Sequence, residues 1–189
     1  MGGTVIRVLD VLIAGVGLVV ALPLLLICLP IISLTSAGAP IFAQQRVGRQ
    51  QRLFVCYKLR TMRIGTVSAA THEVSRTAVT PLGALLRRTK LDELPQLWNV
   101  LVGDMSLVGP RPCLPGQTEL ISARDGRGVY ALRPGITGPA QVLGVDMSEP
   151  ERLSCLDQTW LVDRSVHAYL ALIVLTLIGR GRGDRVRAS

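Results

Sequence analysis

Residues 11–35 read VLIAGVGLVVALPLLLICLPIISLT and carry no charged side chain. About 20 apolar residues are enough to cross a bilayer as a helix, so this stretch predicts a membrane segment. A cleaved secretory signal peptide is the alternative, and it needs a basic start, a shorter apolar run and a small-residue cleavage site. Arg7 and residues 36–39 resemble those features weakly, but the apolar run is too long and Asp10 is unusual before it. We therefore interpret the stretch as a retained membrane element.

Two prolines interrupt this stretch. Pro23 lies in its middle and Pro30 follows one to two turns later, and each removes a backbone hydrogen bond and bends a helix. A helix broken at Pro23 could enter the membrane and leave by the same face, which would put Arg7 and residues 44–46 on one side. A straight span that tolerates the proline is the alternative. The residues alone leave both open.

The composition limits the class of protein. The 189 residues are enough for one domain and a membrane element. A hydrophobic content of 49% and a mean hydropathy of +0.41 are high for a soluble domain and low for a multi-span transporter. The net charge of +8 suits nucleic acid, an anionic membrane surface or a polyphosphate substrate. With 4% aromatic residues and no recognisable nucleic-acid-binding motif, we expect no nucleic-acid partner.

After residue 40 the sequence predicts an α/β fold that is mainly helical with a few short strands. Alternating apolar residues in LFVCYKL, 53–59, predict a strand after a turn at 46–48. Thr80 and Pro81 are typical of a helix start, and a second helix is expected from Asp92 through ELPQLWNVL. The other expected elements are a loop at 65–79, a brief strand within 105–112, a helix or loop at 115–128, a turn-rich connector at 132–144, a helix at 150–165 and a short apolar helix at 166–178.

The strongest candidate for chemistry is residues 87–95, RRTKLDELP. Two adjacent carboxylates, Asp92 and Glu93, occupy an expected helix start, and three basic residues precede them. A helix N-terminus favours anions and should keep a carboxylate ionised. An ionised aspartate could attack phosphorus while its neighbour holds a divalent cation. A charged helix cap without chemistry is the alternative, and the basic surroundings in a membrane-tethered chain favour the first interpretation.

Further basic residues surround the expected strand at 53–59. Lys58, Arg60 and Arg63 could converge on a pyrophosphate, because arginine recognises phosphate through paired donors. A solvated basic face near lipid is the alternative. Neither a Walker loop nor a GxGxxG fingerprint after a strand occurs, so a nucleotide would be bound in another way. The remaining members of this basic set are Arg46, Arg49, Arg52, Arg111 and Arg133.

Several long motifs resemble one known family. They are YKLRTM at 57–62, RRTKLDELPQLWNV at 87–100, GDMSLVGPRP at 103–112 and RPGITG at 133–138. In this order they resemble the bacterial sugar transferases, specifically the small monotopic polyprenyl-phosphate phosphoglycosyl transferases. The resemblance extends with gaps from about residue 5 to residue 178.

The resemblance implies an activity. Asp92 would attack the β-phosphate of a UDP-sugar and release UMP, and polyprenyl (undecaprenyl) phosphate would then attack the covalent phosphosugar–aspartate. Glu93 would bind Mg²⁺, which offsets phosphate charge. This reaction would be the first membrane step of glycoconjugate or exopolysaccharide synthesis. The residues implied to bind substrate are Lys58, Arg60, Arg87, Arg88, Arg111, Arg133 and Asp157.

The resemblance also implies an organisation around the membrane. The family's N-terminal segment is a re-entrant helix broken at a Ser-Pro pair with both ends in the cytosol, which favours a hairpin broken at Pro23. We expect a membrane hairpin at 1–38, a cytosolic catalytic domain with interfacial helices at 39–178 and a basic flexible tail at 179–189. The expected location is the inner (cytoplasmic) membrane of a bacterium, with the catalytic domain facing the cytosol.

The sequence departs from the family pattern at a few positions. Leu22 replaces the serine of the Ser-Pro pair, Thr159 and Trp160 replace a pair of tyrosines, and Asp163 replaces an asparagine. These departures are compatible with an unusual sugar donor or with reduced activity. A non-catalytic membrane scaffold that kept the fold is therefore the competing function. The sequence does not identify the sugar, the oligomeric state or the pathway.

Overall fold

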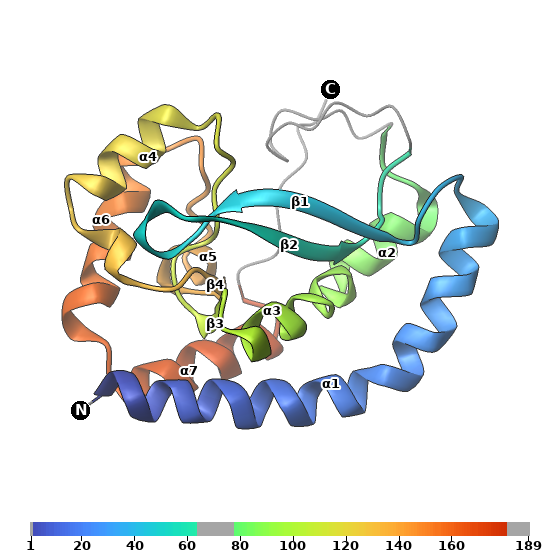
Figure 1. Cartoon of the computed structure of the whole chain (residues 1–189), viewed down its shortest axis with the longest axis horizontal. Helices are drawn as coiled ribbons and strands as arrows, with labels where there is room; N and C mark the ends of the chain where they lie inside the picture. The colour runs from blue at the N-terminus through green and yellow to red at the C-terminus, as the bar shows by residue number, and fades with distance from the viewer. Residues whose placement is uncertain (1, 64–77, 181–189) are drawn as a thin grey trace.

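The computed structural model describes residues 2–63 and 78–180, and Figure 1 shows their arrangement. The mainly helical α/β prediction is confirmed. Most of the loop expected at 65–79 and most of the tail expected at 179–189 lie outside the described residues. The elements are α1 (Gly2–Thr35), β1 (Ile41–Val47), η1 (Arg49–Gln51), β2 (Leu53–Leu59), α2 (Pro81–Arg88), η4 (Leu91–Glu93), α3 (Gln96–Val102), β3 (Ser106–Val108), α4 (Thr118–Asp125), η5 (Val129–Ala131), β4 (Gly135–Thr137), α5 (Pro139–Val142), α6 (Pro150–Asp163) and α7 (Val166–Leu177).

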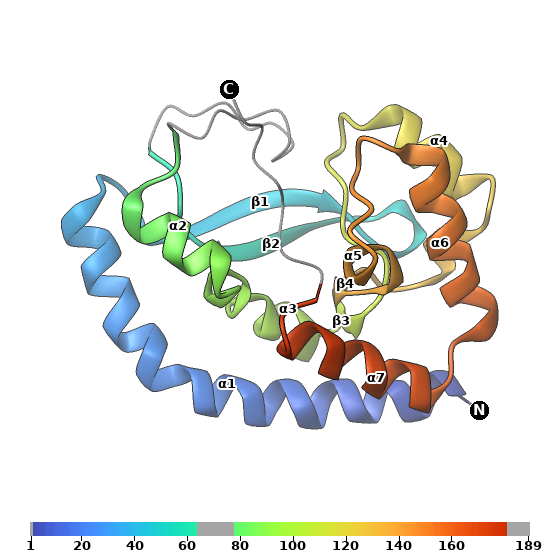
Figure 2. The ribbon, with the colours of Figure 1, turned by 180° about the vertical axis from the view of Figure 1, so that it is seen from behind.

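The N-terminal helix α1 is long and apolar enough to cross a membrane. Its 34 residues give it a length of roughly 50 Å at 1.5 Å per residue. The helix continues through Pro23 and Pro30, and Figures 1 and 2 show it as one bent helix that curves around the rest of the molecule. The expected break at Pro23 is therefore a bend in a continuous helix, because each proline removes one hydrogen bond while the turns on either side persist.

The first turns of α1 are joined to the domain through a buried carboxylate. Asp10 is 2% exposed, and its Oδ1 accepts hydrogen bonds of 2.9 Å from the Ser106 hydroxyl, the Leu107 N–H and the Tyr169 hydroxyl. Burial and the nearby Asp10 charge raise the pKa of Tyr169, so the phenol keeps its proton and donates. Asp10 thus joins α1 to β3 and α7.

A second contact fastens α1 to the C-terminal end of α3. The Arg7 guanidinium donates to the carbonyls of Val100 at 2.7 Å and Leu101 at 3.0 Å. The last carbonyls of a helix have no partner within it, so a cation there is favourable. Gly17 faces α3 at this contact, because a Cβ at that position would lie in ordinary van der Waals contact with the Leu97 side chain, at 3.4 Å.

The other end of α1 contacts the same domain. Cys28 and Ile32 pack in one buried cluster with Leu59 of β2 and Leu86 of α2. The Arg60 guanidinium donates to the carbonyl of Ala37, just beyond the helix. Both ends of this long helix are therefore held by one domain.

The strand predicted at 53–59 is confirmed as β2, which pairs antiparallel with β1 in a register that sets Ile41 opposite Leu59. The turn expected at 46–48 was placed too early. Arg46 and Val47 still belong to β1, and the chain reverses over residues 48–52, where Gln50 and Gln51 have positive φ. The reversal is closed by the Gly48 N–H, which donates to the Arg52 carbonyl at 2.9 Å.

Asn99 fixes this hairpin against α3. Its side chain is completely buried, donates to the Val55 carbonyl at 2.7 Å and accepts from the Tyr57 N–H at 3.1 Å. These bonds satisfy two backbone groups on the free edge of β2. They also set the position of Lys58, the next residue along the strand.

The strand expected within 105–112 is confirmed as β3, which pairs in parallel with β4. The connector expected at 132–144 contains that unexpected strand. Glycines permit the pairing, since a Cβ at Gly135 would lie 2.0 Å from the Gly109 nitrogen and one at Gly138 would lie 2.4 Å from the Gly109 oxygen. This close crossing fixes the backbone directly before residues 110–112.

Three of the helices expected beyond residue 80 are present, those that begin near residues 81, 150 and 166. Thr80 caps α2 by accepting from the Gly83 N–H at 2.9 Å, with Pro81 in the first turn. The helices predicted at 150–165 and 166–178 correspond to α6 and α7. In Figure 2, α7 and α3 lie between the strands and α1.

The Asp10 contact should be essential for attaching α1. Asp10→Ala leaves buried donors without an acceptor and is expected to lower stability by about 2–3 kcal/mol. For a chain of this length that corresponds to a fall of roughly 4–12 °C in the thermal midpoint, measured on detergent-solubilised protein. Tyr169→Phe removes one donor and should cost about 1 kcal/mol. Asp163→Ala, at an exposed position, is the control; an Asp10→Ala midpoint equal to that of the control would contradict this role.

Candidate active site

The two carboxylates lie in a short turn that leads into α3. Asp92 and Glu93 belong to the 3-10 turn η4, which follows Lys90 in the left-handed conformation. The α-helix expected from Asp92 begins only at Gln96. Pro95 has no N–H to donate. The Leu94 N–H donates to the Leu91 carbonyl and the Leu97 N–H donates to the Leu94 carbonyl, so the hydrogen bonds here follow the 3-10 pattern.

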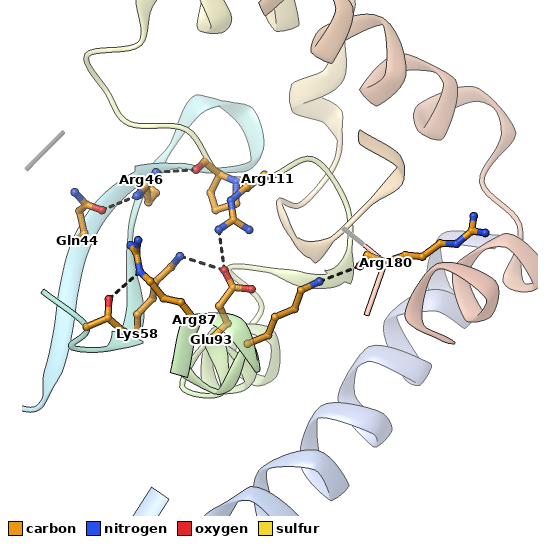
Figure 3. Close-up of polar contacts among 10 residues, drawn as sticks. Gln44, Arg46, Lys58, Arg87, Glu93, Arg111 and Arg180 are labelled. Atoms are coloured by element: carbon orange, nitrogen blue, oxygen red, sulfur yellow. Dashed lines mark hydrogen bonds and ion pairs between the residues drawn. The ribbon is translucent and has the colours of Figure 1, made fainter. Parts of the chain in front are cut away.

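Glu93 is the centre of a charged cluster built from three segments (Figure 3). Its Oε1 accepts from Arg111 Nη2 at 2.7 Å and from Lys58 Nζ at 3.2 Å. Lys58 comes from β2 and Arg111 from the loop after β3. All three side chains are largely buried. The structure thus brings together three residues that the sequence analysis selected.

Asp92 lies in the same electrostatic environment. Its side chain is 6% exposed. Burial raises the pKa of Asp92 and the neighbouring Glu93 raises it further, whereas Lys58, Arg87 and Arg111 lower it. The net direction is upward, opposite to the downward shift expected from the dipole of a helix start. Loss of solvent penalises the charge, and a three-residue turn provides little opposing dipole.

The other expected phosphate ligands differ in their placement. Arg87 donates through Nε to the Thr61 hydroxyl at 3.0 Å, and its Nη1 is buried without a hydrogen-bond partner among the described residues. It therefore has donor capacity left close to Asp92. Arg60 is engaged with the end of α1, as described above. Arg88 is exposed on α2.

Asp157 does not lie on the surface of the site. It is 1% exposed and forms a buried ion pair with Arg124, with 2.7 Å between Arg124 Nη2 and Asp157 Oδ2. Arg124 Nη1 in turn donates to the Arg111 carbonyl at 2.8 Å. The expected substrate contact at Asp157 is thus a buried support for the backbone of Arg111. Arg46 holds the next residues of that loop by donating to the Pro112 carbonyl at 3.1 Å.

Arg133 lies away from the Glu93 cluster. Its Nε donates to the Gly103 carbonyl at 2.8 Å. Gly103 follows the C-terminal end of α3, whereas Asp92 and Glu93 precede its N-terminal end. The structure therefore does not bring Arg133 to the two carboxylates.

Sequence reasoning missed Arg124, Thr61 and Asn99, which position the charged residues. None of them lies in a recognised charge pattern. A buried asparagine in the apolar run QLWNVLV was the one local signal, because an amide there needs hydrogen-bond partners from elsewhere in the fold.

The sequence model of the bacterial sugar transferase family matches residues 1–180. The chain belongs to this family. A UDP-glucose:undecaprenyl-phosphate glucose-1-phosphate transferase of Caulobacter vibrioides is 43% identical, over 74% of this chain and 54% of its own length. A Bacillus subtilis protein named as a candidate undecaprenyl-phosphate N-acetylgalactosaminyl 1-phosphate transferase is 41% identical, over 72% of this chain and 81% of its own. The exopolysaccharide production protein ExoY of Rhizobium meliloti is 34% identical, over 94% and 85%.

These relationships establish this bacterial sugar transferase as an enzyme of the transferase class. In the family motif RRTKLDELPQLWNV, Asp92 and Glu93 are the only carboxylates. They lie where β2, η4 and the loop after β3 meet. The local geometry therefore concentrates one acidic pair and several cations at a single place.

The buried ion pair of Arg124 and Asp157, which supports the backbone of Arg111, should contribute far more to the free energy of unfolding than an exposed ion pair. Asp157→Asn leaves Arg124 with an uncompensated buried charge and is expected to cost about 3 kcal/mol in unfolding free energy. Glu151→Gln is the matched control on the same helix, because Glu151 pairs with Arg127 at the same 2.7 Å but is 75% exposed. Thermal unfolding of both variants measures the difference. Equal midpoints would show that the Arg124 pair does not stabilise this region.

Proposed function

We propose that this sugar transferase moves a sugar-1-phosphate from a UDP-sugar to polyprenyl phosphate and releases UMP. The observation that carries the proposal is the pair Asp92 and Glu93, held beside Lys58 and Arg111 at the meeting point of three segments. The names of two relatives specify undecaprenyl phosphate as the acceptor, and one specifies UDP-glucose as the donor. The competing scaffold function has no need of such a cluster.

Asp92 is the proposed nucleophile. In the first step an Asp92 carboxylate oxygen forms a bond to the β-phosphorus of the donor, and the bond to the bridging oxygen breaks, so that UMP leaves with the electron pair. In the second step an oxygen of polyprenyl phosphate attacks the same phosphorus. The Asp92–phosphorus bond breaks and the carboxylate is regenerated. The products are UMP and a polyprenyl diphosphate-linked sugar.

The surrounding cations suit the charge that moves in these steps. Lys58, Arg87 and Arg111 all act on the carboxyl of Asp92 in the direction that favours its ionised form. Arg87 also has an unused buried donor in the described structure. Fixed donors in a partly desolvated site stabilise developing phosphate charge more strongly than the same groups in water.

Mg²⁺ is the proposed cofactor. The described residues contain no group of three His, Cys, Asp or Glu side chains that could hold a metal by themselves. Mg²⁺ is commonly bound by one or two carboxylates together with substrate phosphates and water, and Asp92 and Glu93 fit this donor set. Glu93 is the proposed ligand. When bound, the ion would offset phosphate charge during transfer.

The attachment of α1 supports a re-entrant topology. Arg7 and Asp10 hold the start of the helix to the domain, and Ile32 and Arg60 hold its end to the same domain. A helix that crossed the bilayer would place its ends on opposite faces. We therefore place the helix within one leaflet, with the domain at 39–178 on the cytosolic face of the inner membrane.

The chemistry is tested by UMP release from a panel of UDP-sugars in the presence of undecaprenyl phosphate and Mg²⁺. The wild type should release UMP from at least one donor, and Asp92→Asn should lower the rate by about 10³-fold or more, because it removes the nucleophile. Asp125→Asn, an exposed aspartate on α4, is the matched control and should retain activity. Equal rates for Asp92→Asn and wild type would exclude Asp92 as the nucleophile, and folded protein inactive on every donor would favour the scaffold.

The topology is tested by labelling cysteines with a membrane-impermeant maleimide. Thr4→Cys and Ala37→Cys, both at exposed positions, are made separately in a Cys155→Ser background, because Cys155 is the exposed native thiol among the four. Both positions should be labelled in inverted membrane vesicles and protected in intact spheroplasts. Opposite labelling of the two positions would establish a full membrane span.

A further inference from the structure

A cavity lies at the end of α3 opposite the two carboxylates. It encloses about 370 Å³, which is within the size range of small-molecule sites. Asp10 is the one acidic residue in its lining, and Trp160 forms part of its wall. Four arginines line it, and we call it the arginine pocket after them. They are Arg7, Arg49, Arg133 and Arg164.

The arginine pocket has a surplus of positive charge. Asp10 already accepts three hydrogen bonds, as described above. Arg7 and Arg133 donate to carbonyls at the end of α3, so these hydrogen bonds do not pair them with a carboxylate. Burial and the neighbouring Arg7 and Arg49 lower the pKa of Arg133, which reflects this crowding of cations. In residues 2–63 and 78–180 the side chains of Arg49 and Arg164 make no hydrogen bond or ion pair, and both are exposed.

The pocket lies beside the apolar surface of α1. Gly3 and Thr4 in the first turn of the helix line it. Val5 and Val8 of the same turns are 47% and 53% exposed, and exposed apolar helix residues of this kind lie at the boundary between headgroups and acyl chains. In the re-entrant topology proposed above, the surplus charge would therefore lie at the depth where lipid phosphates are found.

We propose that the arginine pocket binds the phosphate of an acidic phospholipid headgroup. Guanidinium groups match phosphate oxygens through paired donors. The pocket is separated from Asp92 and Glu93 by the length of α3, so this binding is distinct from the proposed sugar-phosphate transfer and does not depend on it. Occupation would hold the first turns of α1 at the lipid surface.

The pocket contains its own reporter, because Trp160 lines it and the chain has two tryptophans. Trp98→Phe, at an exposed position of α3, leaves Trp160 as the single tryptophan in the full-length protein. In non-ionic detergent, dihexanoyl phosphatidylglycerol is titrated and the Trp160 emission is recorded. Dihexanoyl phosphatidylcholine and inorganic phosphate are titrated separately. We expect a saturable response to phosphatidylglycerol alone.

Three double substitutions distinguish binding in the pocket from an effect of general surface charge. Arg49→Gln with Arg164→Gln should weaken phosphatidylglycerol binding by about 30-fold. Arg52→Gln with Arg152→Gln removes the same charge from exposed positions outside the pocket and should leave the binding within about twofold of the parent. Arg49→Lys with Arg164→Lys keeps the charge without the planar fork and should give an intermediate loss. The thermal midpoint of each variant verifies folding.

Several results would overturn the proposal. An equal response to phosphatidylcholine would mean that no phosphate charge is recognised. Unchanged binding in the folded Arg49 and Arg164 glutamine variant would exclude the pocket. A response to inorganic phosphate, but not to phosphatidylglycerol, that requires both arginines would assign the pocket to a soluble anion and refute the lipid headgroup.

Discussion

The carboxylate of Asp10 is the contact on which the arrangement of this sugar transferase depends. Placing a charge in an otherwise apolar helix is costly in lipid, and here the cost is offset by three donors from β3 and α7. Because β3 leads directly into the loop that carries Arg111, this contact links α1 to the candidate active site. Without it, the polar attachment of this region would be reduced to the bonds of Arg7 and Arg60 to backbone carbonyls. The remaining apolar contacts have little preference between the domain and lipid tails.

The same logic applies to the candidate active site. Glu93 lies between Lys58 and Arg111. Asn99 holds the strand that carries Lys58 through the backbone of Val55 and Tyr57, and Arg124 holds the backbone carbonyl of Arg111. Such supporting contacts keep charged side chains in one orientation before a substrate arrives. The carboxylates and cations compensate one another, so the cluster can be buried without an isolated charge.

Local signals made part of this fold predictable from the sequence. The strand at 53–59 alternates apolar residues, and Thr80 and Pro81 determine a helix start by their own chemistry. The acidic pair and its basic neighbours could also be selected, because they are adjacent in sequence. These predictions required no knowledge of contacts between distant residues.

The remaining features depend on distant partners. Asp157 could not be recognised as a support, because Arg124 precedes it by 33 residues and nothing local connects them. Strand β4 forms where Gly135 packs closely against the backbone of Gly109. The hydrophobic periodicity of the sequence gives no sign of this contact. The direction of the Asp92 pKa likewise depends on burial that only the assembled domain produces.

The bend of α1 has a consequence for the lipid around the enzyme. With both ends attached to one domain, as the contacts of Asp10 and Arg60 require, the proposed topology inserts helix volume into a single leaflet. That leaflet must expand laterally while the opposite leaflet does not. In the proposed orientation, with the domain on the cytosolic face, the enzyme would therefore favour membrane regions that curve toward the cytosol, where the spacing of the inner headgroups is already widened.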